Sequence, residues 1–206
     1  MISRKFKTVF VHIPKTAGQS IESVFLEAHG LTWETRAELL LYPNNDPAKG
    51  PERLAHLYAQ EYLSYGYLTE NEFRDFFKFS IVRNPYSRIV SAFNFRPHDF
   101  KQIREFVESA RDDNRNDFRR HVTPQVKFLT NDVNGTIVVD NIIRYEDLSR
   151  DIPRLFRNIF GKNIDLPHKN AAKQIKISVE SLSGSDINFI NEFYKEDFET
   201  LAYPLL

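Results

Sequence analysis

Two short apolar runs, each followed by a turn and an amphipathic stretch, dominate the pattern of hydrophobic and polar positions. The first run, Val9–Ile13, precedes a loop with Gly18 and then a stretch in which apolar residues recur at helical spacing. The recurring residues are Ile21, Val24, Phe25 and Ala28. This spacing is typical of a helix with one buried face, and Gly30 is placed to end it. The segment therefore predicts a strand, a tight loop and a helix.

The second unit repeats this order. Phe77–Val82 is an apolar run, and a helix is expected from Pro85 because proline is tolerated in the first turn of a helix. A third strand is predicted over Val138–Tyr145, followed by a helix over Leu148–Phe160. Strands that alternate with helices predict an α/β fold: a three-layer arrangement of a parallel sheet flanked by helices on both faces. We expect one domain over residues 1–206.

The remaining segments predict shorter elements. Short helices are expected at Thr69–Phe76, at Phe100–Ala110 and directly after Gln125. A final amphipathic helix is expected to be capped by Ser185. Arg111–Arg120 is dense in charge and asparagine and predicts an exposed loop, whereas Leu31–Glu52 is crowded with Pro, Asn and Gly. The length of this second loop suits an acceptor-binding segment better than a plain connection.

Composition narrows the function classes. The 206 residues are 41% hydrophobic, and 28 basic residues balance 28 acidic ones. Nucleic-acid partners are not expected, because such proteins usually carry a basic excess. The absence of cysteine excludes disulfides, cysteine metal sites and thiol catalysis. No apolar run reaches the ~18 residues of a membrane span, and no signal peptide is visible. A cytoplasmic location is expected, although a trimmed form of a longer protein also fits; the oligomeric state stays open.

The loop after the first strand carries the first candidate chemistry. A helix start aims backbone N–H groups and its positive dipole end at the loop. Lys15 adds a full charge there, and Thr16, Gln19 and Ser20 add side-chain donors. Such a loop suits a phosphate or a sulfate. It is not a Walker loop, because the lysine precedes the glycine.

A second anion site is indicated at Arg83, which ends the second strand. Arginine offers forked, always-charged donors that suit a phosphate. Ser91 follows about two helical turns later, and Arg88 is expected to share its face, opposite the apolar one. Because the carboxyl ends of parallel strands collect ligands at one edge of a sheet, both sites would hold one ligand with phosphates at two positions.

The sequence resembles a known family at these positions. HIPKTAGQS and SIVRNPYSRIVSAF are similar to the two cofactor loops of sulfotransferases that use 3′-phosphoadenosine 5′-phosphosulfate (PAPS), in particular the Golgi-type, family 2 carbohydrate sulfotransferases. TPQVKFL, VDNIIRYEDL, LPHKN and FYKEDFETLAY match later landmarks of that group in the same order, so the resemblance covers nearly the whole chain. It implies a P-loop-NTPase-like sulfotransferase fold.

The resemblance also implies roles for individual residues. It implies that the 5′-phosphosulfate is held by Lys15, Thr16, Ala17, Gly18, Gln19 and Ser20. The 3′-phosphate would be held by Arg83 and Ser91. Gln19 stands where Thr is more usual, but its backbone N–H is unaffected. The Golgi location of the eukaryotic relatives does not carry over, since this chain shows no anchor.

The implied reaction is an in-line displacement that moves a sulfuryl group from PAPS to a hydroxyl acceptor, with a carbohydrate expected. Lys15 would stabilise the charge on the leaving oxygen, and no metal is expected because protein donors can neutralise that charge. The acceptor hydroxyl needs a base, for which histidine is suited. His56 lies where the family's base usually falls; His121 is the second candidate for the base or an acceptor contact, and Glu61 the third. Gln125 would bond the acceptor or cap the adjacent helix.

Other side chains leave alternatives open. Four aromatic residues could stack on sugar rings or belong to the core: Trp33, Tyr42, Tyr58 and Tyr62. Three arginines could grip an acidic acceptor or be solvated: Arg115, Arg119 and Arg120. Asn170 and Lys173 would close over the nucleotide. Two other functions are weighed. A nucleotide kinase would need a Walker loop and a magnesium-binding Asp, and neither is evident; an inactive nucleotide-binding protein would lack the catalytic residues present here.

Overall fold

One sheet organises the computed structural model, which describes residues 1–95, 99–112, 116–131, 133–167 and 177–206. Within these residues the sheet has 4 strands in the order β1-β2-β3-β4. They are β1 (Ile2–Ser3), β2 (Thr8–Val11), β3 (Phe77–Val82) and β4 (Asn141–Arg144). β2, β3 and β4 pair in parallel, but β1 pairs with β2 antiparallel. The expected all-parallel sheet is therefore wrong at its edge, because the short turn between β1 and β2 cannot make a parallel crossover.

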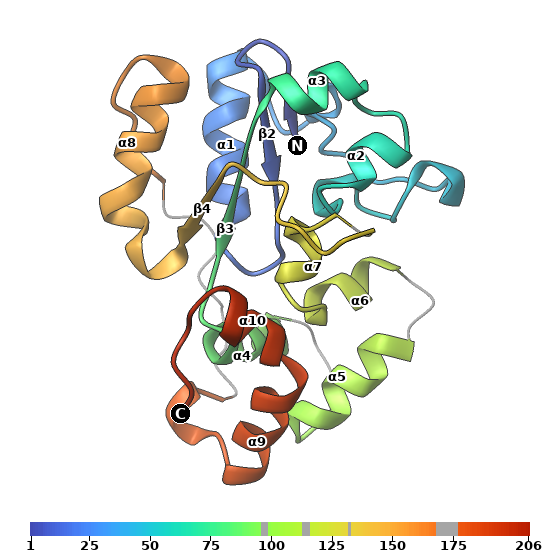
Figure 1. Ribbon diagram of the computed structural model, residues 1–206, viewed down its shortest axis with the longest axis vertical. Helices are drawn as coiled ribbons and strands as arrows, with labels where there is room; N and C mark the ends of the chain where they lie inside the picture. The colour runs from blue at the N-terminus through green and yellow to red at the C-terminus, as the bar shows by residue number, and fades with distance from the viewer. Residues whose placement is uncertain (96–98, 113–115, 132, 168–176) are drawn as a thin grey trace.

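Helices flank the sheet on both sides (Figure 1). The first five are α1 (Gly18–His29), α2 (Glu61–Ser64), α3 (Glu70–Asp75), α4 (Pro85–Phe95) and α5 (Ile103–Asp112). They are followed by α6 (Asn116–Val122), α7 (Val126–Leu129), α8 (Leu148–Phe160), α9 (Gly184–Phe193) and α10 (Lys195–Thr200). Single turns of 3-10 helix are η1 (Arg36–Leu39), η2 (Pro47–Lys49), η3 (Leu54–His56), η4 (Tyr145–Asp147) and η5 (Val179–Ser181). None of the helices in the described ranges is long and apolar enough to cross a bilayer.

Two apolar cores lie on opposite faces of the sheet, since successive strand side chains point to opposite faces. Phe10 and Phe79 pack with α1 and α8, which lie together on one side in Figure 1. Val9 and Val11 belong to the other core, with Tyr62 of α2 and with α4 and α7. The strands are thus covered by helices on both faces. The one-domain organisation stays a prediction.

Several predicted bounds are confirmed. β3 and α8 have the predicted ends, and α1 and α4 follow their strands as expected. Gly30 ends α1 in a left-handed conformation with φ of 69°.

Two expectations are wrong. The segment expected as an exposed loop carries the end of α5 and most of α6, where Asp117 and Arg120 are buried. The charged residues of this segment pair with residues far away in the sequence, such as His56 and Glu61, so the local sequence does not predict their burial. Ser183, not Ser185, caps α9, because its hydroxyl accepts the Asp186 N–H. The last helix is also divided at Tyr194 into α9 and α10.

Candidate functional site

A cavity opens beside the carboxyl ends of β2 and β3, which are adjacent because these strands are parallel. The residues that line it are His12, Pro14, Lys15, Ala17, Gly18, Gln19, Ser20, Arg53, His56, Arg83, Ser91, Phe95, His121 and Tyr145. We call it the donor cavity. It brings together the residues predicted to hold the donor, except Thr16, and two of the candidate bases, His56 and His121. Gln125 and Glu61 do not line it.

The loop between β2 and α1 is held in an unusual backbone conformation. Lys15 and Ala17 have φ of 73° and 69°, which costs an L-residue about 1–3 kcal/mol at each position. Thr16 is fully buried, and its hydroxyl donates to the Ile13 carbonyl over 2.8 Å. This hydroxyl therefore holds the loop in shape and does not face the cavity, contrary to the sequence expectation. Ala17 is the N-cap of α1 and gives its first N–H groups no side-chain cap.

Two cations meet in the donor cavity. Lys15 Nζ lies 3.6 Å from the Phe95 ring centroid, and the Arg83 guanidinium lies 4.2 Å from the Tyr145 ring centroid. Arg83 Nη1 donates to the Lys15 carbonyl over 3.3 Å, which fixes the two residues together.

Neither cation has an anionic partner among the residues that the structure describes. Within the part of the chain that the structure describes, no carboxylate lies within ion-pair distance of Lys15 or Arg83. Arg83 Nε is buried and has no hydrogen-bond partner among the same residues. Burial, and next the charge of Arg83, lower the pKa of Lys15 to about 8. A bound anion would pair with these charges and supply an acceptor for Arg83 Nε, so the cavity suits an anionic ligand.

Ser91 and Arg88 lie one turn apart on α4 but have different surroundings. Ser91 lines the donor cavity, whereas Arg88 is buried and not solvent-facing as the sequence suggested. The Arg88 guanidinium donates to the carbonyl oxygen of Pro14 over 3.1 Å. It also donates to the carbonyls of Thr123 (2.8 Å), Arg120 (3.3 Å) and His121 (3.3 Å). Arg88 therefore links the loop before Lys15 to the end of α6.

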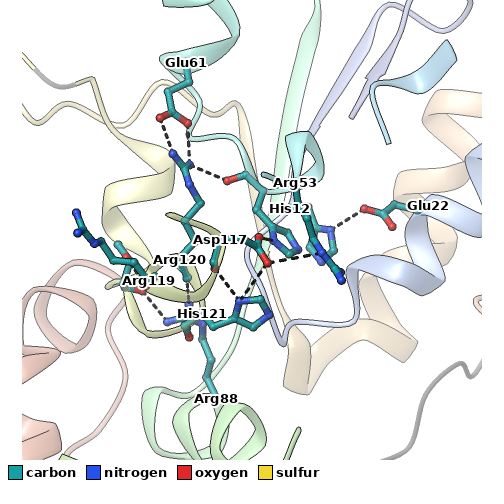
Figure 2. A network of polar contacts seen from close by, with 11 residues as sticks. His12, Glu22, Arg53, Glu61, Arg88, Asp117, Arg119, Arg120 and His121 are labelled. Carbon is teal, nitrogen blue, oxygen red and sulfur yellow. Dashed lines mark hydrogen bonds and ion pairs between the residues drawn. The ribbon is translucent and has the colours of Figure 1, made fainter. Parts of the chain in front are cut away.

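Three imidazoles lie side by side at the other wall of the cavity. The ring of His56 is 4.8 Å from that of His12 and 5.3 Å from that of His121, between centroids. His56 Nδ1 lies 2.6 Å from Asp117 Oδ1, and His12 Nδ1 lies 2.6 Å from Glu22 Oε1. Figure 2 shows Asp117 between His121 and Arg53. His12 is also buried.

The protonation states suit a base at His56. Burial lowers the pKa of His56, and the hydrogen bond with Asp117 opposes this only in part. Burial works against the charge of Asp117, but its hydrogen bond with His56 and the nearby charge of Arg53 hold the pKa of this carboxyl well below its usual range. A neutral imidazole beside an ionised carboxylate can accept a proton near neutral pH.

Glu61 is not placed as a base. Both of its carboxylate oxygens accept hydrogen bonds from Arg120 over 2.7 Å, and Arg120 also donates to the His56 carbonyl over 2.8 Å. Arg120 is therefore a buried structural residue that packs over the Tyr58 ring at 4.0 Å, not a grip for an acceptor. Tyr62 is also buried in the core.

The Gln125 side chain binds the backbone of Arg83. The side chain is fully buried; its Oε1 accepts the Arg83 N–H and its Nε2 donates to the Arg83 carbonyl, each over 2.8 Å. Asp197 accepts the backbone N–H of Gln125 over 2.9 Å. The expected contact between Gln125 and the acceptor is wrong, since the amide is engaged away from the donor cavity.

A second cavity adjoins the first. It shares His12, Gln19, Arg53 and His56 with the donor cavity and extends along Trp33, Arg36, Tyr42 and Pro43. We call it the side cavity. Residues from the long loop predicted for the acceptor line it, and the Arg36 guanidinium lies 4.4 Å from the half-exposed Trp33 ring. His56 thus stands where the two cavities meet.

Several site residues were not anticipated from the sequence: Glu22, Arg53, Phe95, Asp117 and Tyr145. Tyr145 follows the carboxyl end of β4, so the strand-end rule that found Lys15 and Arg83 could have found it. Asp117 is four residues before His121, a helical spacing hidden by the loop interpretation. Arg115, Asn170 and Lys173 lie outside the described residues.

One group of described side chains has the composition of a metal site. His56, Asp117 and His121 each offer a ligand atom, and these atoms lie within 4.8 Å of one another. His56 and Asp117 already share a hydrogen bond through these groups. The expectation that no metal is required stays a prediction.

Comparison with known proteins agrees with this site. A model of the sulfotransferase family matches residues 1–204. Searches of curated proteins and of solved structures gave no match. Since the match extends over nearly the entire sequence, the chain belongs to the sulfotransferase family.

Proposed function

We propose that the protein transfers a sulfuryl group from PAPS to a hydroxyl group of a carbohydrate. Membership of the family supports sulfuryl transfer in general. One observation carries the finer proposal: Lys15 and Arg83, which have no carboxylate partner in the described residues, converge with the uncapped start of α1 on one cavity. Such an arrangement favours a ligand with several anionic groups.

The donor would lie across the ends of β2 and β3. The loop from Lys15 to Ser20 would hold the 5′-phosphosulfate, while Arg83 and Ser91 would hold the 3′-phosphate. The buried, unpartnered Nε of Arg83 supports this assignment, because a phosphate oxygen would supply the missing acceptor. The three-layer, P-loop-like architecture and the cytoplasmic location remain predictions.

The residues divide the chemical work. As the acceptor hydroxyl attacks, a bond forms between its oxygen and sulfur, and the bond from sulfur to the phosphate oxygen breaks. His56 Nε2 would take the hydroxyl proton, and Lys15 would neutralise the electron pair left on the phosphate oxygen. Both groups are held by the fold before reaction, so little reorganisation is needed.

The acceptor would enter through the side cavity. Its Trp33 and Tyr42 offer aromatic faces of the kind that pack against sugar rings, and it leads to His56. These features support a carbohydrate acceptor.

A transfer assay tests the proposal. The protein is incubated with PAPS labelled in the sulfuryl group and a panel of sugars, phenols, tyrosine peptides and aliphatic alcohols. We expect label on sugars, and a rate lower by about 100-fold or more in a His56→Gln variant. A parallel reaction with labelled ATP tests the kinase alternative. Phosphate transfer from ATP, or nucleotide binding without transfer to any acceptor, would contradict the proposal.

A further inference from the structure

We propose that Asp117 is the positioning residue of the base: it holds His56 with a proton on Nδ1, so that Nε2 faces the reaction as the proton acceptor. This inference rests on the proposed function and adds a residue to its site. No local sequence pattern links His56 to Asp117, because Asp117 lies 61 positions later.

The geometry of the pair carries the inference. Nδ1 and Oδ1 are 2.6 Å apart, and the two side chains are only 7% and 4% exposed. An ionised carboxylate only accepts hydrogen bonds, so the proton of this contact belongs to Nδ1. Among the described residues no hydrogen bond reaches Nε2, and His56 lines both cavities. The free lone pair is therefore the one on Nε2.

The carboxylate is fixed relative to the donor loop. His121 Nδ1 donates to the Asp117 carbonyl oxygen over 2.9 Å, one turn along α6. At the end of α6, the Arg88 guanidinium donates to the carbonyls of Arg120 and His121, and it also donates to that of Pro14. One buried guanidinium thus ties the helix that carries Asp117 to the loop that carries Lys15. This link holds α6, and with it Asp117, against the loop that precedes Lys15.

Charged groups approach His56 from each neighbouring element. His12 at the end of β2 and Glu22 of α1 face it on one side, and His121 of α6 faces it on the other. Arg53 lies 3.6 Å from the far oxygen of Asp117, and Arg120 binds the His56 carbonyl. Within this set, Asp117 and Glu22 raise the pKa of His56, whereas burial and His12 lower it. Loss of the Asp117 charge would therefore shift the base to a lower pKa.

An Asp117→Asn variant tests the role, with Asp75→Asn, an exposed carboxylate on α3, as the matched control. We expect Asp117→Asn to lower kcat on the order of 100-fold, with the Kd for 3′-phosphoadenosine 5′-phosphate (PAP) within about twofold of wild type. The acidic limb of kcat/KM should move to lower pH. In a His56→Gln background the same change should alter the remaining rate less than about twofold, since Asp117 acts through His56. A wild-type rate in Asp117→Asn, or an equal loss in both backgrounds, would overturn the inference.

NMR of the imidazole nitrogens in the wild-type protein tests the tautomer without any variant of Asp117. The His56 signals are assigned by their loss in His56→Gln. At neutral pH we expect a proton on Nδ1 and none on Nε2. An active enzyme with the opposite tautomer would overturn this inference alone. The expected tautomer in a protein that transfers no sulfuryl group would overturn the proposed function and leave the His56–Asp117 contact intact.

Discussion

The imidazole of His12 fills the space into which a side chain at residue 18 would point. A Cβ built on Gly18 would lie 2.0 Å from both Cδ2 and Nε2 of His12. The ring is held there, because Nδ1 binds Glu22 and the ring stacks on Phe10 with centroids 5.5 Å apart. Glycine at this position therefore lets the first residue of α1 approach the strand end, which shapes the donor loop.

A Gly18→Ala substitution should force His12 or the loop to move. We expect the free energy of unfolding to fall by about 1–3 kcal/mol and PAP binding to weaken at least about tenfold. Urea unfolding and calorimetry measure the two effects. Gly184→Ala is the control, since nothing lies within 4 Å of a Cβ there. Unchanged PAP affinity in Gly18→Ala would show that the loop does not depend on this contact.

Lys15 should give both catalysis and donor binding a pH dependence. Its pKa is lowered to about 8, so the ammonium is charged below that pH and lost above it. PAP affinity should therefore be steady below about pH 8 and fall as the pH rises further. A Lys15→Met variant should lose this dependence and about 100-fold or more in kcat. A variant with the same decline in PAP affinity would assign the titration to another group.

Arg83 should discriminate the 3′-phosphate. Wild-type protein is expected to bind PAP at least about tenfold more tightly than AMP, which lacks this phosphate. An Arg83→Gln variant should bind PAP more weakly and AMP almost unchanged, so that the preference shrinks. Calorimetric titration of both nucleotides measures it. If the preference for PAP survives in the variant, the 3′-phosphate is held elsewhere.

Paired variants should separate the candidate bases. His56→Gln should lower the rate of transfer by about 100-fold or more and leave PAP binding intact, whereas His121→Gln should retain most of the rate. Because burial lowers the pKa of His56, the acidic limb of wild-type kcat/KM should lie below the ordinary histidine value of 6.5. Activity that survives in His56→Gln and disappears in His121→Gln would move the base to His121.

Arg88 should contribute strongly to stability, because its side chain is almost fully buried and bonds to several segments. Arg88→Met would leave four carbonyl oxygens, three of them buried, without the guanidinium donor and should cost about 3 kcal/mol of unfolding free energy or more. Arg150→Met is the control; this arginine is exposed, and its loss should change stability by less than about 0.5 kcal/mol. Equal urea midpoints for the two variants would contradict the structural role of Arg88.

Much of the fold and of the donor site could be predicted from local pattern. The strand, the loop and the helix around Lys15 follow one another in the sequence. Their hydrophobic spacing and turn residues are therefore enough to predict them. The meeting of Lys15 with Arg83 followed from the rule that parallel strands end at one edge of the sheet. In the structure, Lys15 and Arg83 line the same cavity and share a hydrogen bond.

The buried polar partners could not be predicted in this way. Asp117 is 61 positions from His56, and Gln125 is 42 positions from Arg83. From the local sequence, a charged or amide side chain is predicted to be exposed, because burial of such a group is favourable only when it is paired. Its burial can be predicted only when the distant partner is known. Arg88 was misplaced for the same reason: its partners are backbone carbonyls of other segments, which no side-chain pattern reveals.

Calorimetric titration of the wild-type protein with PAP tests the central claim most directly, that Lys15 and Arg83 together form an anion site for an adenosine donor. We predict one-to-one binding with a Kd in the micromolar range and an at least about tenfold weaker Kd in a Lys15→Met, Arg83→Gln double variant. The absence of binding heat across temperatures, or the same Kd in the double variant, would contradict it.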